Sequence, residues 1–256
     1  MAWDPKTYMS FGAERTRPAG ELLARVDVDT PERVADLGCG PGNSTALLAA
    51  RWPHADISGI DSSPEMLAAA RKSGVDAQWQ KADVATWTPT EPCDVVFSNA
   101  TLQWVPDHRT LLPRLMACVA PGGIFAMQVP RNFGEPCHTL IPEMAKGKSW
   151  AHKFEGVRDW HHVLAPEDYF DVLESHAAAI DVWETRYVQV LEGEDAVFQW
   201  MSGTGLRPFA AALDDGERAE FLEDYRAALA RAYPRRDSGG TLYPFQRLFL
   251  VARARG

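Results

Sequence analysis

Residues 33–52 constrain the fold more than any other part of the chain. A short apolar run at 33–37 leads into three glycines within five residues, and Ala and Leu then recur at helical spacing over 44–52. Pro53 ends that stretch, because proline cannot continue a helix. A strand that passes through a glycine turn into a helix is the opening unit of an α/β sheet.

Strands and helices continue to alternate up to about residue 130. Short apolar runs predict four further strands, at residues 56–60, 77–79, 94–98 and 124–129. Helical spacing predicts helices at residues 64–72 and 110–119. Ser62 or Ser63 can cap the first of these helices, and Pro64 suits its first turn. Because strands separated by helices pair in parallel through right-handed crossovers, we predict a doubly wound α/β sheet.

The pattern changes after Pro130. Residues 131–165 are rich in His, Trp and Pro and predict irregular structure. A helix is expected over 166–176, and two more strands, at residues 180–191 and 245–252, bring the sheet to seven. Between those strands lies a mostly helical insertion that includes residues 217–233. Two insertions near the end of an α/β sheet predict a cap over a small-molecule site.

These patterns divide the chain into six segments. They are an N-terminal lid segment (1–30), an α/β core (31–130), a cap insertion (131–165), a core helix and strand (166–191), a helical cap insertion (192–243) and a last core strand (244–256). The predicted fold is a doubly wound, mostly parallel seven-stranded sheet with a mostly helical cap.

Composition argues against several classes of protein. The net charge of −9, without a run of Lys and Arg, disfavours a nucleic-acid surface. No apolar stretch approaches the ~20 residues that span a bilayer, and residues 1–10 lack the apolar core of a signal peptide. The four cysteines have no C-x-x-C spacing and indicate neither a metal site nor a disulfide framework. We expect a monomeric cytoplasmic protein without nucleic-acid or membrane partners.

The glycine turn is the strongest candidate for a ligand site. Without a Cβ, glycine lets the backbone approach a ligand or adopt positive φ, and this first turn lies in the crevice where α/β sheets bind cofactors. A dinucleotide fingerprint would place its third glycine at Asn43, whereas the spacing here is G-x-G-x-G. A nicotinamide-dependent reductase is therefore disfavoured. The alternative is a tight turn that needs glycine for its geometry alone.

Polar residues follow the next strands. Asp61 ends the second strand, where a carboxylate can accept both hydrogen bonds of a ribose diol, although it can also cap the following helix. Asp83 can accept a hydrogen bond from an adenine amino group beside the backbone amide of Val84, or it can be an ordinary turn residue. Asn99 ends the fourth strand, and Trp104 beyond it either faces the same crevice or anchors the core.

Taken in order, these segments resemble the motifs of class I S-adenosylmethionine-dependent methyltransferases. The matching segments are residues 36–45, 59–64, 82–83, 94–103 and 115–123. The chain resembles the bacterial trans-aconitate 2-methyltransferases more closely, in residues 3–18, 99–108, 204–208 and 245–253. The resemblance covers nearly the whole chain, and residues 14–18 and 204–208 are its more selective parts.

The resemblance implies S-adenosylmethionine as the cofactor, with S-adenosylhomocysteine as the product. The residues that it places around the cofactor are Asp36, Gly38, Gly40, Gly42, Asn43, Asp61, Ser62, Asp83, Val84, Asn99 and Trp104. It implies O-methylation of a carboxylate of trans-aconitate, or of a close small tricarboxylate, to a monomethyl ester. There are two alternatives. The protein could methylate a different small acceptor, or it could be a non-catalytic module that binds S-adenosylmethionine.

This chemistry needs alignment more than acid–base catalysis. A carboxylate with a pKa near ~4 is already ionised at neutral pH, so no general base is required, and the oxygen must be held in line with the methyl donor. The other carboxylates need cations, and the planar fork of arginine suits them. The candidates for acceptor binding are Tyr8, Arg15, Arg17, His161, Trp200, Arg207 and Arg247. For each arginine, the alternative is a solvated surface charge.

Overall fold

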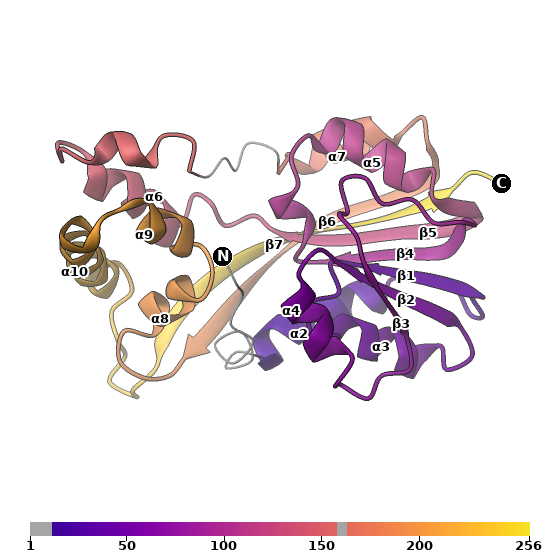
Figure 1. Ribbon diagram of the computed structural model, residues 1–256, viewed down its shortest axis with the longest axis horizontal. Helices are drawn as coiled ribbons and strands as arrows, with labels where there is room; N and C mark the ends of the chain where they lie inside the picture. The colour runs from indigo at the N-terminus through magenta and orange to yellow at the C-terminus, as the bar shows by residue number, and fades with distance from the viewer. Residues whose placement is uncertain (1–11, 158–162) are drawn as a thin grey trace. The chain divides into compact units, whose positions relative to one another are not determined.

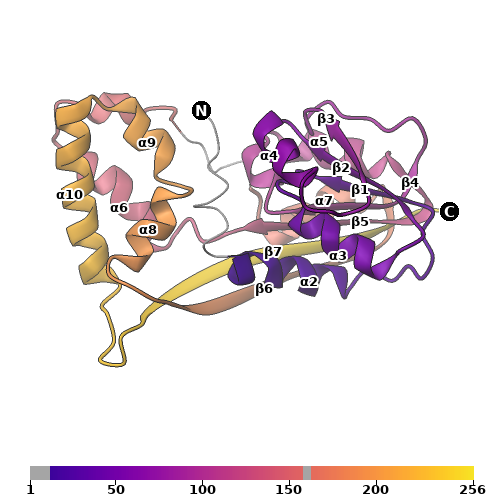
Figure 2. The same cartoon turned by 60° about the horizontal axis from the view of Figure 1, so that its bottom comes forward.

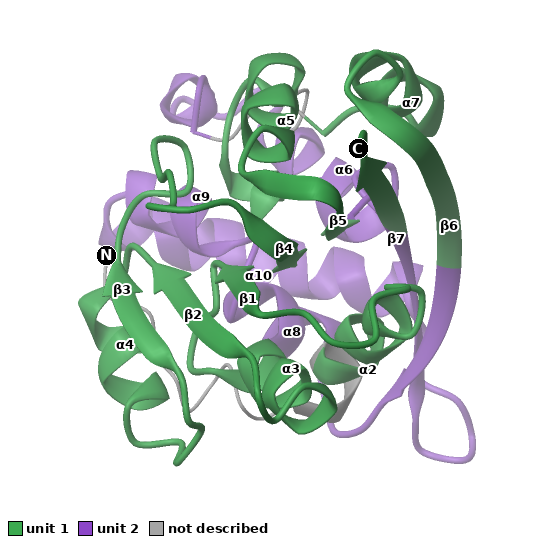
Figure 3. Ribbon diagram, turned by 90° about the vertical axis from the view of Figure 1, so that its right-hand side faces the viewer, with its two compact units in different colours: residues 1–129, 162–185, 248–256 green, residues 130–161, 186–247 purple. Residues whose placement is uncertain are grey.

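The structure is a computed structural model that describes residues 12–157 and 163–256 (Figure 1). The chain divides into two compact units (Figure 3). One comprises residues 1–129, 162–185 and 248–256 and is called the sheet unit here. The other comprises residues 130–161 and 186–247 and is called the helical unit.

The seven strands lie in the order β3-β2-β1-β4-β5-β7-β6. Their bounds are β1 (Arg33–Leu37), β2 (Asp56–Asp61), β3 (Gln78–Lys81), β4 (Cys93–Asn99), β5 (Val119–Pro130), β6 (Ala177–Leu191) and β7 (Thr241–Ala254). β1 pairs in parallel with β2 and β4, β2 with β3, and β4 with β5. The sheet is mostly parallel, with one antiparallel hairpin. The predicted doubly wound α/β sheet is therefore confirmed.

Helices cover both faces of the parallel strands in the sheet unit. On one face lie α2 (Gly12–Leu23), α3 (Asn43–Arg51) and α4 (Pro64–Ala70), and on the other lie α5 (His108–Met116) and α7 (Pro166–Leu173) (Figure 1, Figure 3). Leu37, Ile60 and Phe125 are fully buried in the core of this sheet. The central strands β1, β4 and β5 are mostly buried and apolar, as parallel strands covered on both faces usually are, whereas the edge strand β3 is mostly exposed.

Part of the segment that was expected to be a lid belongs to this core. Ala19 and Leu22 of α2 are buried, as is Val26 just beyond it. Arg51 of α3 donates hydrogen bonds to the carbonyls of Leu23, the last residue of α2, and of Val26 just beyond it. Residues 12–26 therefore form a layer of the sheet unit. The lid over residues 1–30 stays a prediction, and residues 1–11 of it lie outside the described residues.

The helical unit is built around its longest helix. Its elements are α6 (Pro136–Ala145), η2 (Ala151–Phe154), α8 (Ala196–Ser202), α9 (Arg207–Ala212) and α10 (Asp215–Ala232). α10 contacts α6, α8 and α9 (Figure 2). Phe221 of α10 meets Trp150 and Phe154 with ring centroids 5.8 and 5.2 Å apart. Aromatic burial of this kind dominates the packing energy of a small core.

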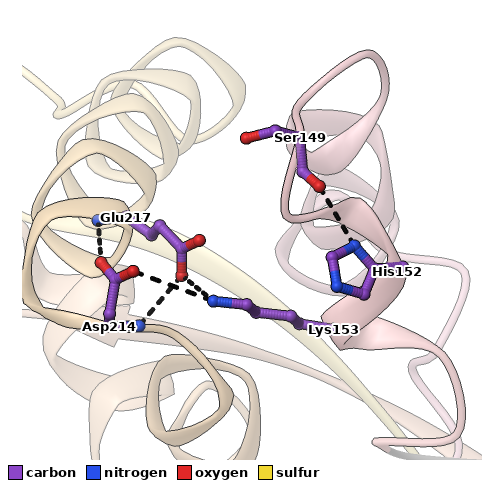
Figure 4. A network of polar contacts seen from close by, with 5 residues as sticks. All are labelled: Ser149, His152, Lys153, Asp214 and Glu217. Carbon is purple, nitrogen blue, oxygen red and sulfur yellow. Dashed lines mark hydrogen bonds and ion pairs between the residues drawn. The ribbon is translucent and has the colours of Figure 1, made fainter.

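A charged network joins η2 to the start of α10 (Figure 4). Asp214 and Glu217 form a capping box, in which each side chain accepts a backbone N–H at 3.0 Å. Lys153 lies 2.5 Å from the Glu217 carboxylate and 3.8 Å from that of Asp214. His152 hydrogen-bonds the Ser149 carbonyl at 3.1 Å. The network fixes where α10 begins and ties η2 to it.

The prediction of irregular structure over residues 131–165 is wrong for part of that range. α6 is a ten-residue helix that starts at Pro136, where a missing N–H costs nothing, and it tolerates Pro142 inside. Two tyrosines hold its first turn: Tyr225 donates to the Cys137 carbonyl at 2.6 Å, and the Cys137 N–H donates to Tyr233 at 3.2 Å. Such tertiary contacts override local composition.

Candidate active site

The glycine turn connects β1 to α3 and is held from β2. The N–H groups of Gly38 and Cys39 both donate to the Ile60 carbonyl, at 2.7 and 3.0 Å. The N–H of Gly40 donates to the Asp61 carboxylate at 2.9 Å. Gly38, Gly40 and Gly42 all have positive φ, which explains why glycine is required at each position. The end of β2 therefore fixes the first half of the turn.

The three glycines face different surroundings. A Cβ on Gly38 would lie 2.0 Å from the Thr101 hydroxyl, and one on Gly42 would lie 3.1 Å from the Trp79 ring. A Cβ on Gly40 would meet no atom of residues 12–157 and 163–256 within 4 Å. Two of the glycines thus make room for protein side chains, and Gly40 is the one whose backbone is open to a ligand.

Asp61 lies beside this open position. Its Oδ2 accepts the Gly40 N–H at 2.9 Å, and its Oδ1 accepts the Ser63 N–H at 2.8 Å. Each carboxylate oxygen has a second lone pair, so a half-buried Asp61 can still accept two hydroxyl groups. The helix cap that was the alternative role for Asp61 is instead Ser63, which accepts the Met66 N–H at 3.2 Å, and Ser62 is exposed.

Asp36 is fully buried at the end of β1. Its Oδ2 accepts hydrogen bonds from the hydroxyls of Ser44 and Thr45, both at 2.7 Å, which anchors the start of α3. Burial raises the pKa of Asp36 from 3.8 to about 6, against the lowering effect of those hydroxyls. Burial also raises the pKa of the neighbouring Cys39 thiol, which keeps it protonated and excludes it as a nucleophile at neutral pH.

The raised pKa of Asp36 predicts how stability depends on pH. The folded protein binds this proton more tightly than the unfolded chain, so its contribution to the free energy of unfolding is complete below about pH 4 and is lost as pH rises through about 6. Asp36→Asn removes this dependence. As the pH rises from 4 to 7, the free energy of unfolding of the variant should increase relative to that of the wild type by up to about 3 kcal/mol. Denaturant unfolding at several pH values measures the difference, and a constant difference would contradict the raised pKa.

The other predicted cofactor residues lie at the ends of β3 and β4. Asp83 is exposed and accepts the Ala85 N–H at 2.9 Å, which is the turn role named as its alternative and leaves its other oxygen available. Val84 is buried. The Oδ1 of Asn99 is buried and lacks a hydrogen-bond partner among the described residues. Trp104 is 42% exposed, so it is not a core anchor.

Sequence reasoning missed Thr101. Its hydroxyl donates to the Gly38 carbonyl at 3.1 Å, and it follows Ala100, whose φ of 54° is strained for a residue with a Cβ. Gln103 supports this loop by donating to the Ala100 carbonyl at 2.7 Å. Strain of this kind concentrates at functional sites. The local signal for Thr101 was its place two residues after the end of a strand.

The structure places the acceptor candidates unequally. Tyr8 and His161 lie outside the described residues, and Arg15 lies in α2. Arg17 is exposed and pairs with Glu21 at 2.8 Å, as a surface charge does. In the helical unit, Arg207 is half-buried at the start of α9. Of the four arginine candidates, Arg207 and Arg247 belong to the helical unit.

Trp200 and Arg247 come together in the helical unit. Each is 3% exposed. Phe245 links them, because the Arg247 guanidinium lies 4.4 Å from its ring centre and the Trp200 ring centre lies 5.7 Å from it. Arg247 is thus a buried cation stacked on an aromatic face and not the solvated charge that was its alternative.

Several known proteins are similar to this chain. A family model described as a methyltransferase domain matches residues 34–123. Relatives named trans-aconitate 2-methyltransferase include one from Azoarcus sp. (strain BH72), 47% identical over 98% of each chain. One from Escherichia coli (strain K12 / DH10B) is 44% identical, also over 98% of each chain.

Solved structures match the fold. A putative methyltransferase from Bacillus halodurans has a TM-score of 0.58 at 11% identity and covers 94% of this chain and 100% of its own. A Haemonchus contortus phosphoethanolamine N-methyltransferase, solved with S-adenosyl-L-methionine, has a TM-score of 0.55 at 15% identity and covers 93% of this chain and 53% of its own. At such identities the likeness shows the fold alone.

The mostly parallel seven-stranded sheet with its flanking helices is the fold of a class I methyltransferase, and the methyltransferase-domain model matches residues 34–123 of it. Identity of 44–48% over nearly the whole length then fixes the family. The chain belongs to the trans-aconitate 2-methyltransferases.

Proposed function

We propose that the protein transfers the methyl group of S-adenosylmethionine to a carboxylate oxygen of trans-aconitate, or of a close small tricarboxylate, giving a monomethyl ester and S-adenosylhomocysteine. The observation that carries this proposal is 47% identity over 98% of both chains to a relative of that name. The site in the sheet unit supports it, because its residues fit a nucleoside cofactor.

Three features make that fit. Gly40 offers backbone to a ligand, because no atom of the described part of the chain lies within 4 Å of a Cβ built there. Asp61 offers a carboxylate with spare lone pairs for the two hydroxyls of a ribose. Asn99 offers a buried oxygen that lacks a partner among the described residues, which a donor group on a ligand would satisfy.

Each cofactor residue has a proposed role. Asp61 binds the ribose diol, and Asp83 with the Val84 amide binds the adenine. The glycine turn and Asn99 receive the amino-acid end of the cofactor. Asp36 acts behind them by holding the start of α3 through Ser44 and Thr45. Asn43, Ser62 and Trp104 complete the proposed set.

The bound cofactor supplies an electrophilic methyl group on a sulfonium cation. The protein's task is to deliver an anionic oxygen in line with it. Arg207 and Arg247 bind the carboxylates that do not react, through bidentate hydrogen bonds that fix orientation as well as charge. The guanidinium of Arg247 is buried against the Phe245 ring, and this low-dielectric surrounding strengthens its attraction for an anion. Tyr8, Arg15, Arg17 and His161 stay predictions for the same acceptor site.

We also propose that the enzyme works as a monomer in the cytoplasm without a nucleic-acid partner. All four cysteines are free and buried, which suits a reducing compartment. The net charge of −9 disfavours a nucleic-acid surface. None of the helices in residues 12–157 and 163–256 is long and apolar enough to cross a membrane.

Incubation with isotope-labelled donor and a panel of acceptors tests the proposal. The panel is trans-aconitate, cis-aconitate, citrate, isocitrate and itaconate, with products read by mass spectrometry. We expect a labelled monoester of trans-aconitate that mild base hydrolyses, since esters are base-labile and N- or C-methyl products are not. Labelling of another acceptor would favour a different methyltransferase. Binding of S-adenosylhomocysteine without transfer to any acceptor would favour a non-catalytic module.

A further inference from the structure

Trp79 lies on β3 directly opposite Gly59 of β2 in the sheet register. We propose that Trp79 is a positioning residue: its indole ring supports the glycine turn at Gly42 and thereby sets the affinity for the methyl donor. This inference rests on the proposed cofactor site and assigns a role within it to a residue that no motif contains.

The ring fills the space that two glycines leave. A Cβ on Gly59 would lie 2.5 Å from Cζ3 and 2.6 Å from Cε3 of Trp79. A Cβ on Gly42 would lie 3.1 Å from Cη2 of the same ring. A glycine inside a strand commonly marks a close approach by another group. Here the group is the indole, which lies against β2 and reaches the end of the turn.

The end of the turn is where this support is needed. Residues 38–40 are fixed by the hydrogen bonds that their N–H groups donate to the Ile60 carbonyl and the Asp61 carboxylate. Gly42 has a φ of 97° and precedes α3 without a side-chain cap. Its N–H donates to the Cys39 carbonyl of the same turn at 3.0 Å. A Cβ built on Gly42 lies 3.1 Å from the Trp79 ring and 3.4 Å from the Ser73 hydroxyl, so the ring is one of two side chains that limit how far Gly42 can move.

Trp79 also connects the two ends of the proposed cofactor site. Four residues after it, β3 leads into Asp83, and the Ala82 N–H donates to the Asp61 carbonyl at 3.2 Å. The same strand thus carries the adenine-side residues and the ring that supports the turn. A shift of the ring changes the separation between these groups, to which a rigid cofactor is sensitive.

The surroundings of Trp79 argue against a role in general packing. It is half-buried on an edge strand whose other three residues are exposed. It is not a member of the hydrophobic core cluster of the sheet unit, whereas Trp87 is. Replacing Trp79 should therefore affect cofactor binding more than the stability of the fold.

Calorimetric binding of S-adenosylhomocysteine, together with Tm without ligand, tests this role. We expect Trp79→Leu to raise the Kd about 10-fold, in the range of coupling between residues in contact, and to change Tm little. Trp79→Phe keeps an aromatic ring and should recover part of the affinity. Gly59→Ala should also weaken binding, because its methyl group displaces the ring. The double variant Gly59→Ala/Trp79→Leu should lose less binding free energy than the two single variants lose in sum.

Trp52→Leu is the matched control. Trp52 is buried at the far end of α3, where its indole N–H donates to the Val28 carbonyl at 3.1 Å. Its loss should lower Tm and leave the Kd unchanged. An unchanged Kd in Trp79→Leu, or a loss of affinity that follows Tm as in a general packing defect, would overturn the inference. Failure of the wild type to bind S-adenosylhomocysteine would instead overturn the proposed function.

Discussion

Asp61→Asn is expected to weaken binding of S-adenosylhomocysteine about 100-fold while the fold is retained. A hydrogen bond to a charged acceptor contributes about 1.5–3 kcal/mol, and loss of about 3 kcal/mol corresponds to roughly 100-fold in Kd. Asn keeps only one acceptor oxygen. It can accept the Gly40 or the Ser63 N–H, but it cannot accept both of them and a ribose diol as well. Isothermal titration calorimetry measures the Kd. The Tm from thermal unfolding shows whether the fold is retained.

Asp56→Asn is a control on the same strand. Asp56 starts β2, is exposed, and lies at the opposite end of the strand from Asp61. Its substitution removes the same negative charge from the protein, so it corrects for any general electrostatic effect of that loss on ligand binding. Equal Kd values for the two variants would remove Asp61 from the cofactor site. A large fall in Tm in Asp61→Asn alone would show that its main role is to hold the turn.

The sequence was sufficient for the parts of the site that depend on neighbouring residues. The glycine turn was recognisable because a strand, closely spaced glycines and a helix follow one another within twenty residues. Asp61 was predictable because strand ends in parallel sheets meet at one edge. Ser63 as a helix cap follows from the same local rules.

Contacts that depend on register or on distant segments could not be predicted. The support of Gly42 by Trp79 requires the pairing of Gly59 with Trp79, which is fixed only when β2 and β3 align. α6 forms in a proline-rich segment because Tyr225 and Tyr233, about ninety residues away, hold its first turn. The burial of Arg247 likewise depends on Phe245 and Trp200.

Arg207→Ala is expected to raise the KM for trans-aconitate about 100-fold and to leave the KM for S-adenosylmethionine within about 2-fold of the wild type. A bidentate pair between guanidinium and carboxylate holds the substrate before and during transfer, so its loss removes binding in both states. Steady-state kinetics with each substrate varied in turn separates the two constants. Arg207→Lys keeps the charge but not the planar fork, and it should give an intermediate KM.

Arg231→Ala supplies the comparison for this prediction. Arg231 lies exposed near the end of α10 in the same helical unit, so its loss changes the net charge equally without touching a buried group.

If Arg207 binds the substrate from a partly buried position, raising the salt concentration should increase the wild-type KM for trans-aconitate only modestly, because ions screen buried pairs weakly. An unchanged KM for trans-aconitate in Arg207→Ala would make Arg207 a surface charge and leave Arg247 as the cation that orients the acceptor. A parallel rise in both KM values would instead indicate that the substitution disturbs α9, which Arg207 begins and Phe209 anchors.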